Sequence, residues 1–121
     1  MKPPVGPYSF WRRAGELVVI SGQLGLDYTG DAPVLVEGSA ADQLRRALAN
    51  AREVLAEAGA SFDQVIKGTL FLVDMADYRS CNEVWSEAFN EPRPTRTAVA
   101  VAQLPLDARC EVELWAHAPL G

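Results

Sequence analysis

Histidine and cysteine are scarce in this chain, which limits the metal chemistry it could support. It contains a single histidine, His117, and two cysteines, Cys81 and Cys110, far apart in the sequence. A closed structural zinc site needs more cysteine and histidine ligands than these residues supply, so we expect no metal. The two cysteines fit no redox or metal-binding spacing. We therefore expect reduced thiols in a cytoplasmic protein.

Long apolar runs and an excess of basic residues are also missing. The longest apolar runs, such as Leu17–Ile20 and Ala98–Ala102, are far too short to span a membrane, and Met1 to Pro4 contain no apolar stretch of the signal-peptide type. Lys and Arg total 11 against 16 Asp and Glu, a net charge of −5. Because nucleic-acid affinity requires a basic face, this balance argues against a dedicated nucleic-acid binder.

The composition is that of an ordinary globular domain. Hydrophobic residues make up 49% and charged residues 22% of the 121 positions. A chain of this length buries about two-thirds of its surface on folding, which is enough for a core without disulfide or metal staples. We predict one domain over residues 1–121.

Hydrophobic spacing predicts two helices and one sheet. The expected elements are strands at 17–21 and 24–28, a helix from Ser39 to about Gly59, a strand at 65–74, a helix at 77–90, and strands at 95–103 and 109–117. Ser39 and Asp42 form a capping pattern at the start of the first helix, and Gly59 marks its end. This order predicts a two-layer α+β domain with both helices on one face of the sheet.

The face of the sheet away from the helices needs a separate explanation. Alternation along the last two strands places on it Arg96, Ala98, Ala100 and Ala102 from one strand, and Arg109, Glu111, Glu113, Trp115 and His117 from the other. Val99 would then face the helices. Because a row of alanines makes a poor surface for water, we expect the uncovered face to pack against another subunit.

Common catalytic motifs are absent. The chain has no P-loop, no dinucleotide-binding glycine fingerprint and no nucleophile elbow. Cys81 and Cys110 fall on the apolar faces of a helix and a strand, where buried thiols are inert. His117 is expected to be a partly exposed residue at the end of a strand.

Arg96 and Glu111 remain as candidates for chemistry. Arg96 opens a strand made otherwise of Thr, Ala and Val, and a guanidinium suits bidentate binding of a carboxylate or phosphate. Glu111, expected on a neighbouring strand, could act as a general base or orient a water molecule. A plain ion pair between the two residues, or a solvated strand end, would explain the same pattern.

Several segments in a fixed order resemble one protein family. They are Gly6-Pro7-Tyr8-Ser9, Val19-Ile20-Ser21-Gly22-Gln23, Pro94-Thr95-Arg96-Thr97 running into Val99–Pro105, and Glu111-Val112-Glu113. This set resembles the RidA family, also called YjgF/YER057c. The match extends from about Val5 to Ala116, nearly the whole chain.

The resemblance implies a fold, an assembly and an activity. The fold is a chorismate-mutase-like α+β protomer, and the assembly is a homotrimer whose sheets form a central barrel, with clefts between subunits. The implied activity is hydrolysis of reactive 2-imino acids, or of 2-aminoacrylate-type enamines, to 2-keto acids and ammonia, without a metal or cofactor. The partner is thus a small 2-imino acid substrate.

The resemblance also implies roles for particular residues. Arg96 matches the family arginine that binds the substrate carboxylate, and Glu111 matches the glutamate near the attacking water. Tyr8 matches a tyrosine that lines the cleft, while Gly22 and Asn82 match other pocket positions. Many members carry a cysteine two residues after the arginine, a position that is Ala98 here.

Two other functions stay open. One is a non-enzymatic trimer, ligand-sensing or chaperone-like, that holds a small carboxylate in the same cleft. The other is an endoribonuclease, an activity attached to some family members. Binding alone would need only Arg96, so the presence of Glu111 favours an enzyme, and the net charge of −5 counts against a ribonuclease.

Overall fold

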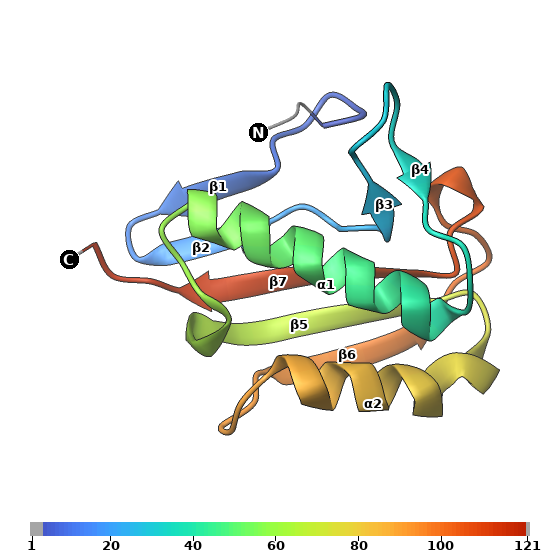
Figure 1. Ribbon diagram of the computed structural model, residues 1–121. Coiled ribbons are helices and arrows are strands. Elements are labelled where there is room, and N and C mark those ends of the chain that lie inside the picture. Colours follow the sequence, from blue (N-terminus) through green and yellow to red (C-terminus); the bar gives the residue numbers. More distant parts are fainter. Residues whose placement is uncertain (1–3, 121) are drawn as a thin grey trace.

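A mixed sheet with both helices on one of its faces forms the body of the chain, as Figure 1 shows for this computed structural model. The structure describes residues 4–120. The elements within them are β1 (Trp11–Ala14), β2 (Leu17–Ile20), β3 (Leu26–Asp27), β4 (Val34–Leu35), α1 (Ala40–Glu57), β5 (Val65–Leu72), α2 (Tyr78–Ala88), β6 (Thr95–Ala100) and β7 (Cys110–His117), with 3-10 turns η1 (Phe62–Gln64), η2 (Met75–Asp77) and η3 (Pro105–Asp107). The strand order β1-β2-β7-β5-β6, with only β5 and β6 parallel, confirms the two-layer α+β class.

Helix α1 begins and ends where local sequence signals place it. The Ser39 hydroxyl accepts a hydrogen bond from the Asp42 backbone N–H at 3.2 Å, and the Asp42 carboxylate accepts one from the Ser39 backbone N–H at 2.9 Å. This reciprocal pair satisfies two N–H groups that the first turn leaves without partners. Gly59 follows the helix with a φ of +83°, which a residue without a side chain adopts at little cost. The predicted capping box is confirmed.

The N-terminal part of the sheet differs from the prediction. The edge strand β1 was not predicted, because Trp-Arg-Arg-Ala shows little apolar alternation, yet it pairs with β2 along its whole length. Residues 24–28, predicted as a strand of the sheet, contribute only β3, which pairs with β4 in a separate two-stranded sheet. The buried Asn50 side chain donates to the carbonyls of Leu24 and Leu26 at 3.1 and 2.9 Å. These bonds tie the segment to α1.

The predicted faces of β6 were wrong. Ala98 lies opposite Leu70, a fully buried residue that packs in the core, and Val99 lies opposite Phe71. Residues paired across strands share a face, so Ala98 faces the helices and Val99 lies on the uncovered side. Alternating Ala and Val give little amphipathic contrast, and only the register with β5 decides between the two faces. Ala102 lies beyond the end of β6.

The uncovered face carries different apolar residues from those predicted. Register places on it Val19, Phe71, Val99 and Trp115, mixed with Lys67, Thr69, Thr97, Glu111 and Glu113. Trp115 is 39% exposed and Val99 is 37% exposed, values high for large hydrophobic side chains. The surface that would gain most from a partner therefore consists of aromatic and branched residues, not alanines.

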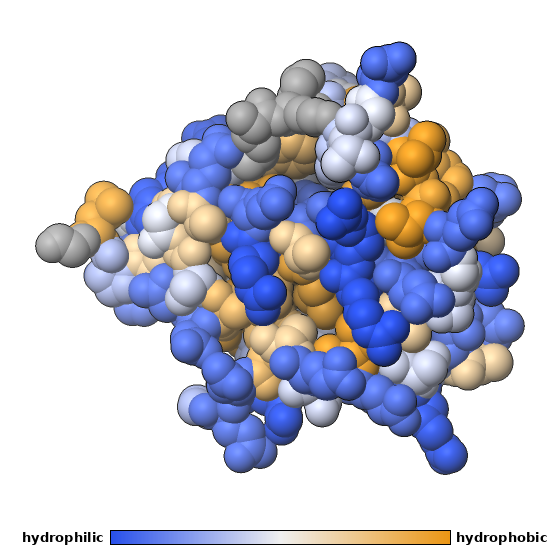
Figure 2. Space-filling view, in the orientation of Figure 1, coloured by the Kyte–Doolittle hydropathy of each residue, from blue (hydrophilic) through white to orange (hydrophobic). Residues whose placement is uncertain are grey.

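The helix-covered side has a mostly hydrophilic surface. Figure 2 shows this side, with apolar colour gathered at the upper right, over β4 and η3. Exposed large hydrophobic residues in those elements are Val34 and Leu106. Within residues 4–120, neither helix has the length and apolar character needed to cross a bilayer.

Candidate active site

Arg96 lies against two aromatic side chains of α2. Its Nη2 donates to the Tyr78 hydroxyl at 3.2 Å. The guanidinium carbon is 5.5 Å from the centroid of the Tyr78 ring and 5.2 Å from that of Trp85, within the range of cation–π attraction. Arg96 is half-buried, and its partner across the sheet on β5 is Gly68. The side chain therefore lies on the helix-covered face.

Glu111 lies on the other face of the sheet, beside Gly22. A Cβ atom at position 22 would come within 2.7 Å of the Glu111 Oε2, so the carboxylate occupies the space that a side chain there would fill. Glu111 is half-buried in β7, two residues before Glu113 on the same face. Burial raises the pKa of Glu111 above its ordinary value, and the negative charge of Glu113 raises it further. A carboxylate with a raised pKa is a stronger base.

One copy of the chain does not bring Arg96 and Glu111 together. The expectation that they lie on neighbouring strands was wrong, because β5 runs between β6 and β7. Arg96 aligns with Gly68 and Leu114, whereas Glu111 aligns with Phe71 and Val99. These two rows belong to opposite faces, so the ion pair that the sequence left open does not form within one chain.

Asn82 and Gly22 each fall near one of these groups, whereas no contact within residues 4–120 joins Tyr8 to either. Asn82 is on α2, one helical turn after Tyr78, and so lies on the Arg96 side of the molecule. Gly22 lies beside Glu111. Tyr8 is exposed in the segment before β1. Burial raises the pKa of Tyr28, and the nearby Tyr8 raises it further. The predicted site is thus split into an Arg96 half and a Glu111 half.

Sequence reasoning missed the aromatic residues that hold Arg96. Tyr78 and Trp85 fall within the helix predicted at 77–90, and nothing else in the sequence singles them out. Their spacing of seven residues places them on one helix face, which is a usable signal. Their contact with Arg96 depends on α2 lying beside β6, which local sequence does not encode.

Both cysteines are buried, as predicted. Burial raises the pKa of Cys81 to about 11 and that of Cys110 to about 12. Both thiols are fully shielded from water, and the Cys110 thiol donates to the Ala40 carbonyl at 3.5 Å. Thiols in this state are poor nucleophiles at neutral pH.

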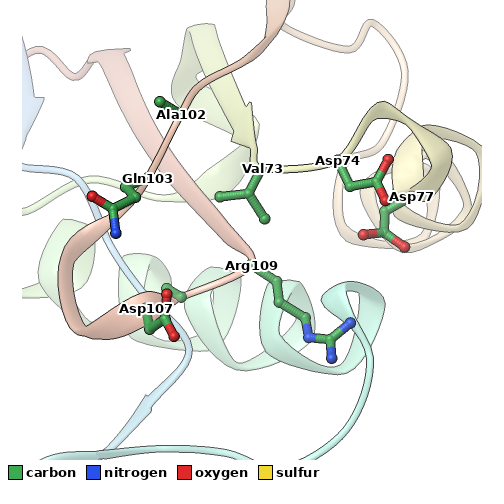
Figure 3. Close-up of a pocket in the computed structure, with 8 residues that line it drawn as sticks. Val73, Asp74, Asp77, Ala102, Gln103, Asp107 and Arg109 are labelled. Atoms are coloured by element: carbon green, nitrogen blue, oxygen red, sulfur yellow. The ribbon is translucent and has the colours of Figure 1, made fainter.

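A pocket of about 600 Å³ is lined by none of the predicted site residues. Figure 3 shows that Asp74 and Asp77 lie together at one side of it and Gln103 and Asp107 at the other, with Arg109 between the two sides. One oxygen of the Asp74 carboxylate already accepts a hydrogen bond from the Ala76 backbone N–H at 2.9 Å. Across residues 4–120, no group of three or more His, Cys, Asp or Glu is placed to hold a metal ion.

Comparison with known proteins gives matches along nearly the whole chain. The family model described as Endoribonuclease L-PSP matches residues 1–118. A RutC family protein of Pyrococcus horikoshii is 43% identical over 94% of this chain and 89% of its own length. The 2-iminobutanoate/2-iminopropanoate deaminase of Homo sapiens is 38% identical over 90% of this chain and 78% of its own length.

Solved structures share the fold. RidA from the Antarctic bacterium Psychrobacter sp. matches with a TM-score of 0.89 at 36% identity, covering 95% of this chain and 92% of its own. E. coli TdcF with bound serine matches with a TM-score of 0.85 at 34% identity, covering 95% of this chain and 91% of its own.

Proposed function

The chain belongs to the Endoribonuclease L-PSP family, which includes the RidA proteins, and from this premise we propose that it hydrolyses reactive 2-imino acids and their enamine tautomers to 2-keto acids and ammonia. Relatives named as deaminases indicate a hydrolytic enzyme. Two observations support the proposal: Arg96 is held by two aromatic rings of α2, and Glu111, on the opposite face, is a half-buried glutamate whose pKa is raised. Arg96 can bind a carboxylate and Glu111 can activate water.

The two halves would meet between copies of the chain. Arg96 and Glu111 lie on opposite faces of one sheet, so a single active site needs Arg96 from one copy and Glu111 from another. We propose a homotrimer with such a site at each contact between subunits. The exposed Val99 and Trp115 on the uncovered face support this assembly, because packing them against another copy removes them from water.

The chemistry requires little beyond positioning. Arg96 binds the carboxylate of the imino acid, and Glu111 holds a water molecule against the imine carbon. As the water oxygen forms its bond to that carbon, the C=N π electrons move to nitrogen and Glu111 takes a proton from the water. Glu111 then returns the proton to nitrogen, which gives a neutral carbinolamine. Glu111 next carries the hydroxyl proton to the same nitrogen, the C–N bond breaks as the C=O bond forms, and ammonia and the 2-keto acid are released. The imine carbon is already electrophilic, so these groups suffice.

A coupled assay tests the proposal directly. An amino-acid oxidase generates 2-imino acids, and their decay is followed with and without the purified protein. Faster decay with the parent chain, absent with the Arg96→Ala variant, supports the deaminase. Binding of a small carboxylate without turnover would support a binding trimer instead, and salt-dependent cleavage of RNA would support a ribonuclease.

The acid side of the pH profile should respond to Glu113. Glu111 works as a base, so kcat/KM should fall as the pH drops through the raised pKa of Glu111. Glu113→Gln removes the second cause of that rise and leaves the larger cause, burial, in place. The acid limb of the kcat/KM profile should therefore move to lower pH.

A matched control uses Glu53→Gln, which removes one exposed carboxylate from α1, away from this face. Its acid limb should coincide with that of the parent. An acid limb that stays in place in Glu113→Gln would show that another group sets it.

The cysteines should be dispensable for turnover. With their pKa values raised to about 11 and about 12, both thiols stay protonated at neutral pH. The double variant Cys81→Ala, Cys110→Ala should lose stability, because it opens small cavities in the core, but its kcat/KM should match that of the parent. Thermal unfolding and the coupled assay measure the two effects separately. A folded double variant without turnover would show that a thiol takes part.

A further inference from the structure

Arg96 carries a positive charge that no carboxylate neutralises in the part of the chain that the structure describes. Within residues 4–120, the ion pairs involve Arg45, Arg46, Arg93 and His117, not Arg96. The groups around its guanidinium are the Tyr78 hydroxyl and the rings of Tyr78 and Trp85. These contacts restrain the side chain without compensating its charge, which leaves it available for an anion.

The Trp85 ring is itself fixed in place. A Cβ atom at Gly68 would lie only 2.7 Å from the Trp85 Cη2 and 3.1 Å from the Leu114 Cδ2. The indole therefore reaches the backbone of β5 through the space that Gly68 leaves, directly beside the position of Arg96 in the register. Trp85 also packs against Phe89, with ring centroids 4.8 Å apart. The Arg96 guanidinium therefore packs against an indole ring that its neighbours hold in place.

Tyr78 holds the guanidinium from a more exposed position. Tyr78 is 39% exposed, and its hydroxyl oxygen accepts a hydrogen bond from one of the five N–H groups of the guanidinium. A carboxylate needs two neighbouring N–H groups in the plane of the guanidinium for bidentate binding. One hydrogen bond and two ring contacts fix that plane while leaving donors free.

We infer that Tyr78 is a positioning residue for Arg96, orienting the guanidinium so that it presents a two-donor edge to the substrate carboxylate. That the bound carboxylate belongs to a 2-imino acid rests on the proposed function. The orientation of Arg96 by Tyr78 does not. Restraining a flexible arginine before binding reduces the entropy lost when the ligand arrives. Because the carboxylate does not react, Tyr78 should strengthen its binding by Arg96 equally in the ground state and in the transition state.

Kinetics of two Tyr78 variants separate the hydroxyl from the ring. Tyr78→Phe removes only the hydrogen bond and should raise KM about fivefold to tenfold with kcat nearly unchanged, as loss of uniform binding does. Tyr78→Leu removes the ring as well and should raise KM further. Because Tyr78 is well exposed, both variants should fold. Ser86→Ala, which removes an exposed hydroxyl from the same helix, is the matched control and should keep the parent KM.

Side-chain NMR of Arg96 gives a readout that does not depend on turnover. The 15Nε relaxation of Arg96 should report an ordered side chain in the parent and in Ser86→Ala, with more motion in Tyr78→Phe and most in Tyr78→Leu. An Arg96 side chain as ordered in Tyr78→Leu as in the parent would overturn the inference, as would a fall in kcat at constant KM. Failure of the parent to hydrolyse imino acids would overturn the proposed function alone, since the NMR comparison would still decide the role of Tyr78.

Discussion

Arg96→Ala should lower kcat/KM for 2-imino acids by roughly two orders of magnitude or more, since hydrogen bonds to charged groups are worth about 1.5–3 kcal/mol each and a bidentate contact has two. The loss of substrate orientation adds to this effect. The fold should survive, because the guanidinium contacts the surface of α2 and is only half-buried. Steady-state kinetics in the coupled assay measure the loss, and circular dichroism verifies the fold.

Arg96→Lys is the informative companion variant. An ammonium keeps the charge but lacks the planar pair of donors, and it stacks less favourably between two rings. We therefore expect Arg96→Lys to recover little of the lost activity. An Arg96→Ala protein that hydrolyses 2-imino acids as fast as the parent would remove Arg96 from the site.

Mixing two inactive variants should restore activity. Glu111→Gln should lower kcat, since the glutamine cannot accept the water proton, while carboxylate binding stays intact. If each site takes Arg96 from one copy and Glu111 from the next, a trimer of mixed Arg96→Ala and Glu111→Gln chains contains some sites with both native residues. Random assembly of equal amounts into a closed head-to-tail ring makes roughly one quarter of the sites intact.

The mixing experiment distinguishes a shared site from a site within one chain. The two variants are mixed in denaturant, refolded together and assayed, with each variant refolded alone as the control. Recovery toward a quarter of the parent activity supports the shared site. If both residues acted from the same chain, every site would lack one of them, and the mixture would stay as inactive as its components.

Local features of this chain could be predicted from sequence, whereas placement across the sheet could not. The Ser39–Asp42 capping box involves residues three positions apart, and the apolar stripe of α1 repeats within one element. Strand β6 shows the limit. Its alternating Ala and Val are compatible with either face, and the pairing with Leu70 and Phe71, distant in sequence, decides which residues face the helices.

The candidate site follows the same division. Resemblance to a family singled out Arg96 and Glu111, but nothing in their spacing indicates that β5 runs between their strands and that they occupy opposite faces. Tyr78 and Trp85 carry a helical signal that marks them only as apolar. Their role becomes visible when α2 is placed beside β6, which is a tertiary arrangement.

The burial of Trp85 also has an optical consequence. Of the three tryptophans, Trp85 is 4% exposed, Trp115 is 39% exposed and Trp11 is intermediate. The Arg96 guanidinium lies 5.2 Å from the Trp85 ring, so an anion that neutralises it alters the electric field at the one shielded indole. A quencher without negative charge reduces emission from the indoles that water can reach and does not compete for Arg96, so the emission that survives comes chiefly from Trp85. Occupancy of Arg96 can therefore be followed by intrinsic fluorescence, with no label on the protein.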